Sequence, residues 1–231
     1  MRGRRAASLS VPDPPAAEYF ALTMALYESG GVGRQMPAKN QDLHGNAPDN
    51  SSVALLLIDV INDLEFEGGK DLLPHAIAMA RNIAVLKRRA KRLGIPVVYV
   101  NDNFGKWQSD FNSVLDHCLE DDVCGKPVAQ SLRPDEDDYF VLKPKHSGFY
   151  STTLDTLLSY LQVKTLILTG LAGDNCVLFT ANDAYMRDYH LVIPSDCVAS
   201  QDPQENEHAL RHIQLTGANI SIRLPIRGIV E

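Results

Sequence analysis

The sequence predicts an α/β protein, a three-layer α/β/α arrangement around a mainly parallel, Rossmann-like sheet. Stretches typical of strands alternate with helical patterns of roughly ten residues or more, as in βαβ units. The apolar runs, such as residues 53–58, lack alternating polar positions, as expected for strands that helices cover on both faces. The chain has 231 residues, which is long enough for one large domain with a full core.

The individual elements follow from their own patterns in chain order. The first strand, residues 53–59, is an apolar run of the buried type. Residues 71–93 carry a helical periodicity that ends at Gly94. The other strands are expected at residues 95–101, 138–142, 164–169, 190–194 and 219–222. The other helices are expected at residues 153–161, 175–188 and 203–215, and residues 104–134 are expected to form a loop with short helical pieces. Thr152 or Thr153 is expected to cap the first of these helices.

The N-terminal segment, residues 1–50, lacks clear periodicity and is rich in proline and glycine. We expect an extension with one short helix over residues 16–27, which contacts either the body of the domain or a neighbouring subunit; a disordered tail is the alternative. The domain then spans residues 51–231. Arginines near the start superficially suggest an export signal, but no continuous apolar segment follows them, which favours a solvated tail.

Composition excludes several classes of partner. The formal net charge is −7, and general nucleic-acid binding needs a basic face, so we expect no nucleic-acid partner. The apolar runs are too short to span a membrane, so no membrane partner is expected either. The chain has 4 cysteines and no Cys-x-x-Cys pair, which does not make a disulfide framework. The simplest setting is reduced and cytoplasmic.

Three reactive residues follow three of the predicted strands. Asp59 ends the first strand, Lys143 follows the third, and Cys176 follows the fourth after a turn of small residues. In open parallel sheets, chemistry collects at the carboxyl ends of the strands. The carboxylate can take the thiol proton, the ammonium can steady both anions, and the start of a helix favours a thiolate. The combination predicts a nucleophilic site.

Each of the three residues also has a simpler interpretation. Asp59 could cap a turn or pair with a nearby cation. Lys143 stands close to Lys145, and a single lysine is more often solvated than catalytic. Cys176 alone is more often a small buried hydrophobe than a nucleophile. Their joint position at one sheet edge is therefore what carries the prediction.

Three segments of the chain resemble a known family. Residues 55–64 (LLLIDVINDL), 141–154 (VLKPKHSGFYSTTL) and 168–177 (LTGLAGDNCV) are similar, in order, to segments of the isochorismatase-like cysteine hydrolases. This family includes nicotinamidases, N-carbamoylsarcosine amidases and ureidoacrylate amidohydrolases, and the likeness covers about residues 52–222. It implies the isochorismatase-like hydrolase fold, and dimers or tetramers are common in the family, so a homo-oligomer is expected.

The resemblance assigns roles to individual residues. The Asp–Lys–Cys triad of the family maps onto Asp59, Lys143 and Cys176. Lys143 is preferred over its neighbour because the family lysine stands four residues before the serine of a Ser-small-Phe motif, here Ser147. The resemblance also implies a cis peptide before the nucleophile, between Leu171 and Ala172. The amide groups of Ala172 and Cys176 would then form the oxyanion hole.

Two departures from the family pattern affect the expected site. Ile61 stands where the family often has a glutamine, so Asn62 is the nearest polar substitute. The Asp-x-His metal motif of nicotinamidases is missing after the second strand, where the chain reads VNDNFG. We therefore expect no metal and no other cofactor. The candidate substrate-binding residues are Asn62, Phe66, Asn103, Phe104, Trp107 and Phe149, and core packing is the alternative for each aromatic residue.

The sequence thus predicts a cysteine-dependent hydrolase of a small amide, carbamoyl or ureido compound, acting through an acyl-thioenzyme. One alternative keeps the fold but changes the chemistry, as in a vinyl-ether hydrolase or a ligand-binding protein. The branch of the family that hydrolyses vinyl ethers lacks the cysteine, so Cys176 favours the amidase. A phosphoreceiver module would also place Asp59 and Lys143 at strand ends, but it needs no thiol. A pure interaction protein is the third alternative, suggested only by the N-terminal extension.

Overall fold

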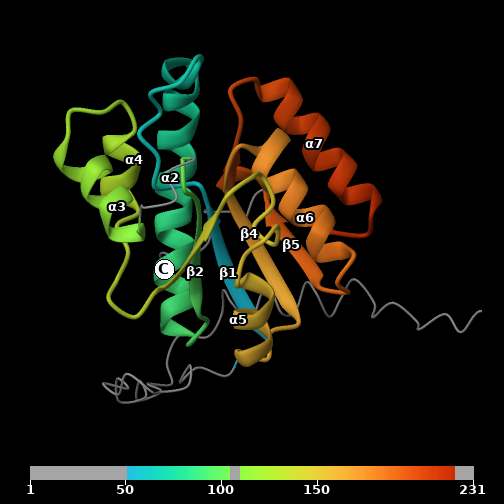
Figure 1. Cartoon of the computed structure of the whole chain (residues 1–231). Helices are drawn as coiled ribbons and strands as arrows, with labels where there is room; N and C mark the ends of the chain where they lie inside the picture. Colours follow the sequence, from blue (N-terminus) through green and yellow to red (C-terminus); the bar gives the residue numbers. More distant parts are fainter. Residues whose placement is uncertain (1–50, 105–109, 222–231) are drawn as a thin grey trace, which may run out of the picture. The chain divides into compact units, whose positions relative to one another are not determined.

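The computed structural model describes residues 51–104 and 110–221. The predicted extension over residues 1–50, its helix at 16–27 and Trp107 lie outside the described residues. Within the described part, the strands form one seven-stranded sheet in the order β3-β2-β1-β4-β5-β7, with β6 paired to β4. Every strand pair is parallel. The predicted fold class is therefore confirmed, with the first strand near the centre of the sheet (Figure 1).

The bounds of the elements agree closely with the predicted ranges. The strands are β1 (Val53–Ile58), β2 (Val97–Asp102), β3 (Tyr139–Lys143), β4 (Thr165–Leu171), β5 (His190–Pro194), β6 (Val198–Ala199) and β7 (Asn219–Ser221). The α-helices are α2 (Gly69–Arg92), α3 (Phe111–Glu120), α4 (Lys126–Ser131), α5 (Leu154–Tyr160), α6 (Leu178–Tyr185) and α7 (Pro203–Leu215). A π-helical turn, η1 (Gly173–Val177), precedes α6, and a 3₁₀ turn, η2 (Ser195–Cys197), precedes β6.

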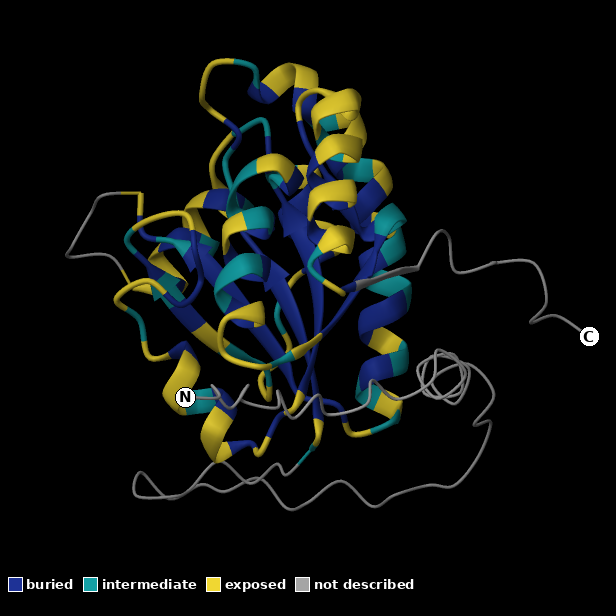
Figure 2. Cartoon of the chain, turned by 90° about the vertical axis from the view of Figure 1, so that its right-hand side faces the viewer, coloured by how far each residue is buried: buried dark blue, intermediate teal, exposed yellow. Residues whose placement is uncertain are grey.

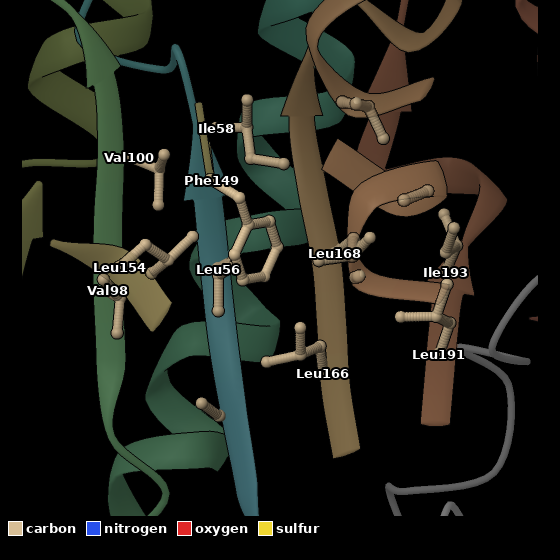
Figure 3. Packing of buried hydrophobic residues seen from close by; sticks show 14 of the residues in the cluster. Leu56, Ile58, Val98, Val100, Phe149, Leu154, Leu166, Leu168, Leu191 and Ile193 are labelled. Atoms are coloured by element: carbon tan, nitrogen blue, oxygen red, sulfur yellow. The ribbon is translucent and has the colours of Figure 1, made fainter. Parts of the chain in front are cut away.

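The sheet lies between two helical layers. On one face, Leu56 of β1 and Leu168 of β4 belong to a buried cluster with Leu158 of α5, Ala181 of α6 and Ile213 of α7. Figure 3 views the sheet from this side, and α2 passes behind the strands. Helix α2 contacts β2, β4 and β6 there. Figure 2 shows the consequence: the strands form an almost continuous buried layer, and exposed residues gather on the outer faces of the helices.

One segment agrees with the sequence-based expectations, and two local features differ from them. The segment predicted as a loop with short helical pieces contains the short helices α3 and α4, and the Asp110 carboxylate caps α3 by accepting the N–H of Ser113. The helix predicted at residues 175–188 divides into η1 and α6. The short strand β6 was not predicted, because two residues carry too little pattern to detect. The N-cap residue of α5 is Thr153, but its side chain makes no capping hydrogen bond; the hydroxyl of the preceding Thr152 instead accepts the N–H of Leu154.

No helix in the described ranges combines the length and the apolar character needed to cross a membrane. The cysteines at positions 118, 124, 176 and 197 are all free thiols.

Candidate active site

The strand register brings the three predicted residues to one edge of the sheet. Ile58 pairs with Gly170 across β1 and β4, so Asp59 and the turn after β4 leave the sheet side by side. Asp102 pairs with Lys143 across β2 and β3, where both strands end. The carboxyl ends of four neighbouring strands therefore meet, which is the usual place for a reaction centre in an open parallel sheet.

Asp59 is held in a strained conformation at the end of β1. Its φ angle is 50°, in the left-handed region, which costs of order 1–3 kcal/mol and is common at functional sites. Its N–H donates to the carbonyl of Val100 at 2.9 Å, and its Oδ1 accepts the backbone N–H of Asp102 at 2.7 Å. Both the main chain and the carboxylate are thus fixed by β2, and the residue is only 5% exposed.

The ammonium group of Lys143 lies close to Asp59, Cys176 and Asp102. Its side chain is fully buried, and its Nζ lies 2.8 Å from Oδ2 of Asp59. The same Nζ donates to Sγ of Cys176 at 3.5 Å and lies 3.5 Å from Oδ2 of Asp102. Burial opposes the charge on this lysine, but the negative charges around it, first that of Asp59, outweigh burial and raise the pKa of Lys143. The ammonium form is therefore the stable one.

Cys176 lies in η1, directly before α6. Burial, followed by the charge of Asp59, raises the pKa of the Cys176 thiol to about 12, although the Lys143 ammonium acts in the opposite direction. This corrects the expectation that the helix start favours the thiolate: the thiol rests in its protonated form at neutral pH. It hydrogen-bonds to the Asp59 carboxylate, whose own pKa is raised by burial against the opposing effects of Lys143 and Cys176.

The turn between β4 and Cys176 is built without a cis peptide. No peptide bond in the described residues is cis, so the prediction of a cis bond between Leu171 and Ala172 was wrong. A trans bond is preferred by about 3 kcal/mol away from proline. Gly170, with a φ angle of 116°, supplies a backbone conformation that side chains rarely adopt. The carbonyl of Ala172 then accepts the N–H groups of the two residues that flank Cys176, at 3.0 and 3.1 Å.

Side chains that the sequence analysis did not select support this turn. The N–H of Asp174 donates to the Ser200 hydroxyl at 3.0 Å. On the other side, the Thr180 hydroxyl donates to the Cys176 carbonyl at 2.7 Å and accepts the N–H of Gly148 at 2.9 Å. Thr180 is fully buried and links the segment after Lys143 to the segment that carries the thiol. A single threonine inside a helix gives no sequence signal for such a link.

Asp102 is the other residue that the sequence analysis missed. Asp102 ends β2 in the same way that Asp59 follows β1. Its position at the end of an apolar strand is therefore a signal that the sequence does contain. Its backbone N–H orients Asp59, and its carboxylate lies near Lys143.

The predicted substrate-binding residues do not gather at one place in the structure. Phe149 packs in the hydrophobic core beside Leu56 and Leu168 (Figure 3), so its assignment to a pocket wall was wrong and the core alternative holds. Asn62 uses its Oδ1 to accept the N–H two residues later, which forms a local turn. Phe66 is 50% exposed, and the buried Asn103 donates its N–H to the Lys143 carbonyl at 3.0 Å. Asn103 therefore lies next to the site, whereas Phe66 stays a prediction.

Asp135, Asp137 and Asp138 are the only acidic group in the described ranges with ligand atoms close enough to share a metal ion. Lys87 Nζ lies 3.1 Å from Oδ2 of Asp135 and 2.6 Å from Oδ2 of Asp138. Lys91 forms ion pairs with Asp137, at 2.8 Å, and with Asp138. Two ammonium groups therefore already balance these carboxylates, and the arrangement is an ion-pair network at the start of β3 that does not suit a metal ion.

A hollow of about 260 Å³ opens on another part of the surface, between α2 and the start of α7. Its lining includes His75, Asn82, Asp196 and Asn206, and none of the three predicted catalytic residues.

The comparisons with known proteins agree with one another. The model of the Isochorismatase domain matches residues 53–222. The chain is similar to the isochorismatase family protein YaaI of Bacillus subtilis (strain 168), with 45% identity over 157 residues that cover 68% of this chain and 86% of that protein. It is also similar to the ureidoacrylate amidohydrolase RutB of Methylorubrum extorquens, with 36% identity over 88 residues that cover 38% of this chain and 36% of that protein.

Among solved structures, the chain is similar to N-carbamoylsarcosine amidase from Thermoplasma acidophilum. The sequence identity is 29% and the TM-score is 0.57, and the match covers 77% of this chain and 100% of that chain.

Proposed function

The chain belongs to the isochorismatase family, and we propose that it is a cysteine hydrolase that cleaves a small carboxamide, carbamoyl or ureido C–N bond through an acyl-thioenzyme. Its relatives include amidohydrolases such as RutB and N-carbamoylsarcosine amidase. The observation that carries the proposal is the position of the Lys143 ammonium, which contacts both the Asp59 carboxylate at 2.8 Å and the Cys176 sulfur at 3.5 Å. A base, a cation and a nucleophile in contact are the parts that such a reaction needs.

Attack and proton transfer occur together in this mechanism. Because the pKa of the Cys176 thiol is about 12, little thiolate exists at neutral pH. Asp59, which hydrogen-bonds to the thiol, accepts its proton as the sulfur forms a bond to the carbonyl carbon of the substrate. The carbonyl oxygen becomes an oxyanion, for which the amide groups of Ala172 and Cys176 are the proposed donors.

The remaining steps return each group to its starting state. The protonated Asp59 gives its proton to the leaving nitrogen as the C–N bond breaks, which leaves a thioester on Cys176. Water then attacks this thioester, and Asp59 accepts a proton from that water. The C–S bond breaks, the sulfur takes the proton back from Asp59, and the acid is released. Lys143 stays an ammonium throughout and balances the charge that moves between carboxylate and sulfur.

The test is ammonia release from a panel of small amides, carbamoyl compounds and ureido acids, measured for the wild type and for Cys176→Ala. Turnover by the wild type that is lost in Cys176→Ala supports the proposal. Cys124→Ala is the matched control, because Cys124 is partly exposed like Cys176 and should be dispensable. Turnover that survives in Cys176→Ala contradicts the thiol mechanism, and a wild type inactive on the whole panel contradicts the substrate class.

A further inference from the structure

The site contains a second carboxylate whose side chain the proposed mechanism does not use. Asp102 ends β2 directly beside Lys143, its partner in the strand register. Its Oδ2 lies 3.5 Å from Nζ of Lys143, compared with 2.8 Å for Oδ2 of Asp59. Asp102 orients Asp59 through its backbone N–H, which any residue at this position except proline could supply. The carboxylate itself is therefore not needed to hold the base.

Asp102 also differs from the other charged members of the site in its exposure. Its side chain is 31% exposed, whereas that of Asp59 is 6% exposed and that of Lys143 is fully buried. The N–H of Phe104 donates to Oδ1 of Asp102 at 2.6 Å, which fixes the carboxylate at the surface of the site. Of the two carboxylates around the lysine, Asp102 is the one that a molecule entering from solvent meets.

The distance between Asp102 and the nucleophile suits a small substrate. Oδ2 of Asp102 and Sγ of Cys176 each lie 3.5 Å from the same Nζ, so their separation is at most twice that distance. A substituent of a substrate whose carbonyl carbon lies at the sulfur can thus reach Asp102. The groups that meet at Nζ comprise one ammonium, two carboxylates and a protonated thiol, so their summed charge is negative. A substrate carboxylate on that side would be repelled.

We infer that Asp102 is a specificity-determining residue, whose carboxylate favours a substrate with an N–H donor or a positive charge beside the reacting carbonyl and disfavours a carboxylate there. The inference deepens the proposed function and rests on it for the reaction itself. It narrows the substrate class to neutral or cationic amides, carbamoyl compounds or ureas. An ionised carboxylate accepts hydrogen bonds from N–H groups about twice as strongly as a neutral acceptor.

Charge selection at the thiol can be measured without a known substrate. Iodoacetamide and iodoacetate both form an S–CH₂ bond at Cys176 with loss of iodide and of the thiol proton, and they differ in carrying a neutral amide or a carboxylate. The two alkylation rates at Cys176 would be followed by mass spectrometry of the peptide that contains it. Their ratio is informative because a change in the thiol pKa affects both reagents alike.

Asp102→Asn removes the charge but keeps an oxygen that can accept the Phe104 N–H. We expect it to raise the rate with iodoacetate, relative to iodoacetamide, by about tenfold. Asp137→Asn is the control, since it removes one charge at the opposite end of β3, about 20 Å away along the strand, and should leave the ratio unchanged. An unchanged ratio in Asp102→Asn overturns the inference. If that variant does not fold, Asp102→Ser provides the same comparison.

Measurements of amide hydrolysis distinguish a failure of this inference from a failure of the proposed function. Butanamide and succinamate carry the same primary amide on chains that end in a methyl group or a carboxylate. Asp102→Asn should raise kcat/KM for succinamate relative to butanamide. If no amide is hydrolysed but the alkylation ratio shifts, the proposed reaction fails while the charge selection stands. If amides are hydrolysed and neither ratio shifts, Asp102 has no role in specificity.

Discussion

Lys143 and Asp59 form a buried ion pair at the end of the sheet, with 2.8 Å between Nζ and Oδ2. The lysine side chain is fully buried and that of the aspartate is 6% exposed, so water does little to stabilise either charge. The two charges are therefore stabilised by each other and by two further contacts. The backbone N–H of Asp102 donates to Asp59, and Lys143 donates to the sulfur of Cys176. Each charge is stable in this position because the other is present.

Removal of the lysine should damage both the stability and the activity of the protein. Lys143→Met leaves Asp59 buried without its cation, which we expect to lower the free energy of unfolding by about 3 kcal/mol. Turnover should fall at least ~100-fold at neutral pH, because Asp59 then holds its proton more strongly. Urea denaturation and amide hydrolysis measure the two effects. Lys145→Met, which changes the exposed neighbour, should alter neither, and equal effects of the two variants would contradict the assignment.

The pH profile should report on Asp59. The mechanism requires its carboxylate form, and burial raises its pKa above the ordinary value of 3.8. Activity is therefore expected at pH values above the raised pKa and lost as the pH falls through it, by about tenfold per pH unit below that point. The measurement is kcat/KM for a neutral amide against pH. A rate that does not fall until the pH drops below 3.8 would show that the carboxyl is not shifted upward.

Thiol reactivity should rise over a wide range of pH. Since the pKa of Cys176 is about 12, its alkylation rate should keep increasing from neutral pH to well above about pH 10. The charge of Asp59 is a cause of this raised pKa, so Asp59→Asn should shift the curve to lower pH. Iodoacetamide labelling of the Cys176 peptide at a series of pH values gives both curves. A wild-type plateau below about pH 8 would instead indicate a stabilised thiolate.

Gly170 should tolerate no side chain. Its φ angle is 116°, and a Cβ at this position would lie 2.0 Å from the Ile58 carbonyl oxygen of the neighbouring strand. Gly170→Ala is expected to lower the free energy of unfolding by on the order of 3 kcal/mol, from strain and overpacking together. Gly94 offers a control, because its φ angle is 68° and no atom lies within 4 Å of a Cβ there. Gly94→Ala should cost only about 1 kcal/mol in thermal or urea unfolding, and equal costs would contradict the packing argument.

Thr180 should matter through its hydroxyl group. Thr180→Val keeps the shape but leaves the Gly148 N–H and the Cys176 carbonyl without this partner, at an expected cost of about 1–3 kcal/mol. Because the hydroxyl joins the segments that carry Lys143 and Cys176, kcat should fall as well. Thr180→Ser restores the donor and the acceptor and should recover most of both. If Thr180→Ser is as impaired as Thr180→Val, the methyl group rather than the hydrogen bonds is what matters.

The sequence was sufficient to predict where the reactive residues converge. Asp59, Lys143 and Cys176 each follow or end an apolar strand, and the rule that parallel strands end at one edge needs only that pattern. The family resemblance gave the same three residues, and the family itself is confirmed by the match over residues 53–222. The order of the strands and the register between them did not follow from local patterns, because they depend on contacts between distant segments.

Two predictions failed, and Thr180 was missed, because they depended on surroundings that the sequence does not show. Phe149 stands close to the lysine in sequence, but its side chain turns into the core between α5 and the sheet. The helix start at Cys176 suggested a thiolate, yet burial and the charge of Asp59 outweigh that effect. The role of Thr180 depends on two partners, one of them 32 residues away, which no local pattern reveals.

The order of strands in the sheet has a consequence for how the protein acquires its reactivity during folding. Lys143 comes from β3, which reaches β1 only across β2, while Cys176, 33 residues later, arrives beyond β4 on the other side of β1. A partly folded chain that has paired β1 with β4 but has not yet docked β3 brings the segment with the thiol close to Asp59 without the cation. Catalytic activity should therefore not return during refolding until the edge strand β3 has docked on β2.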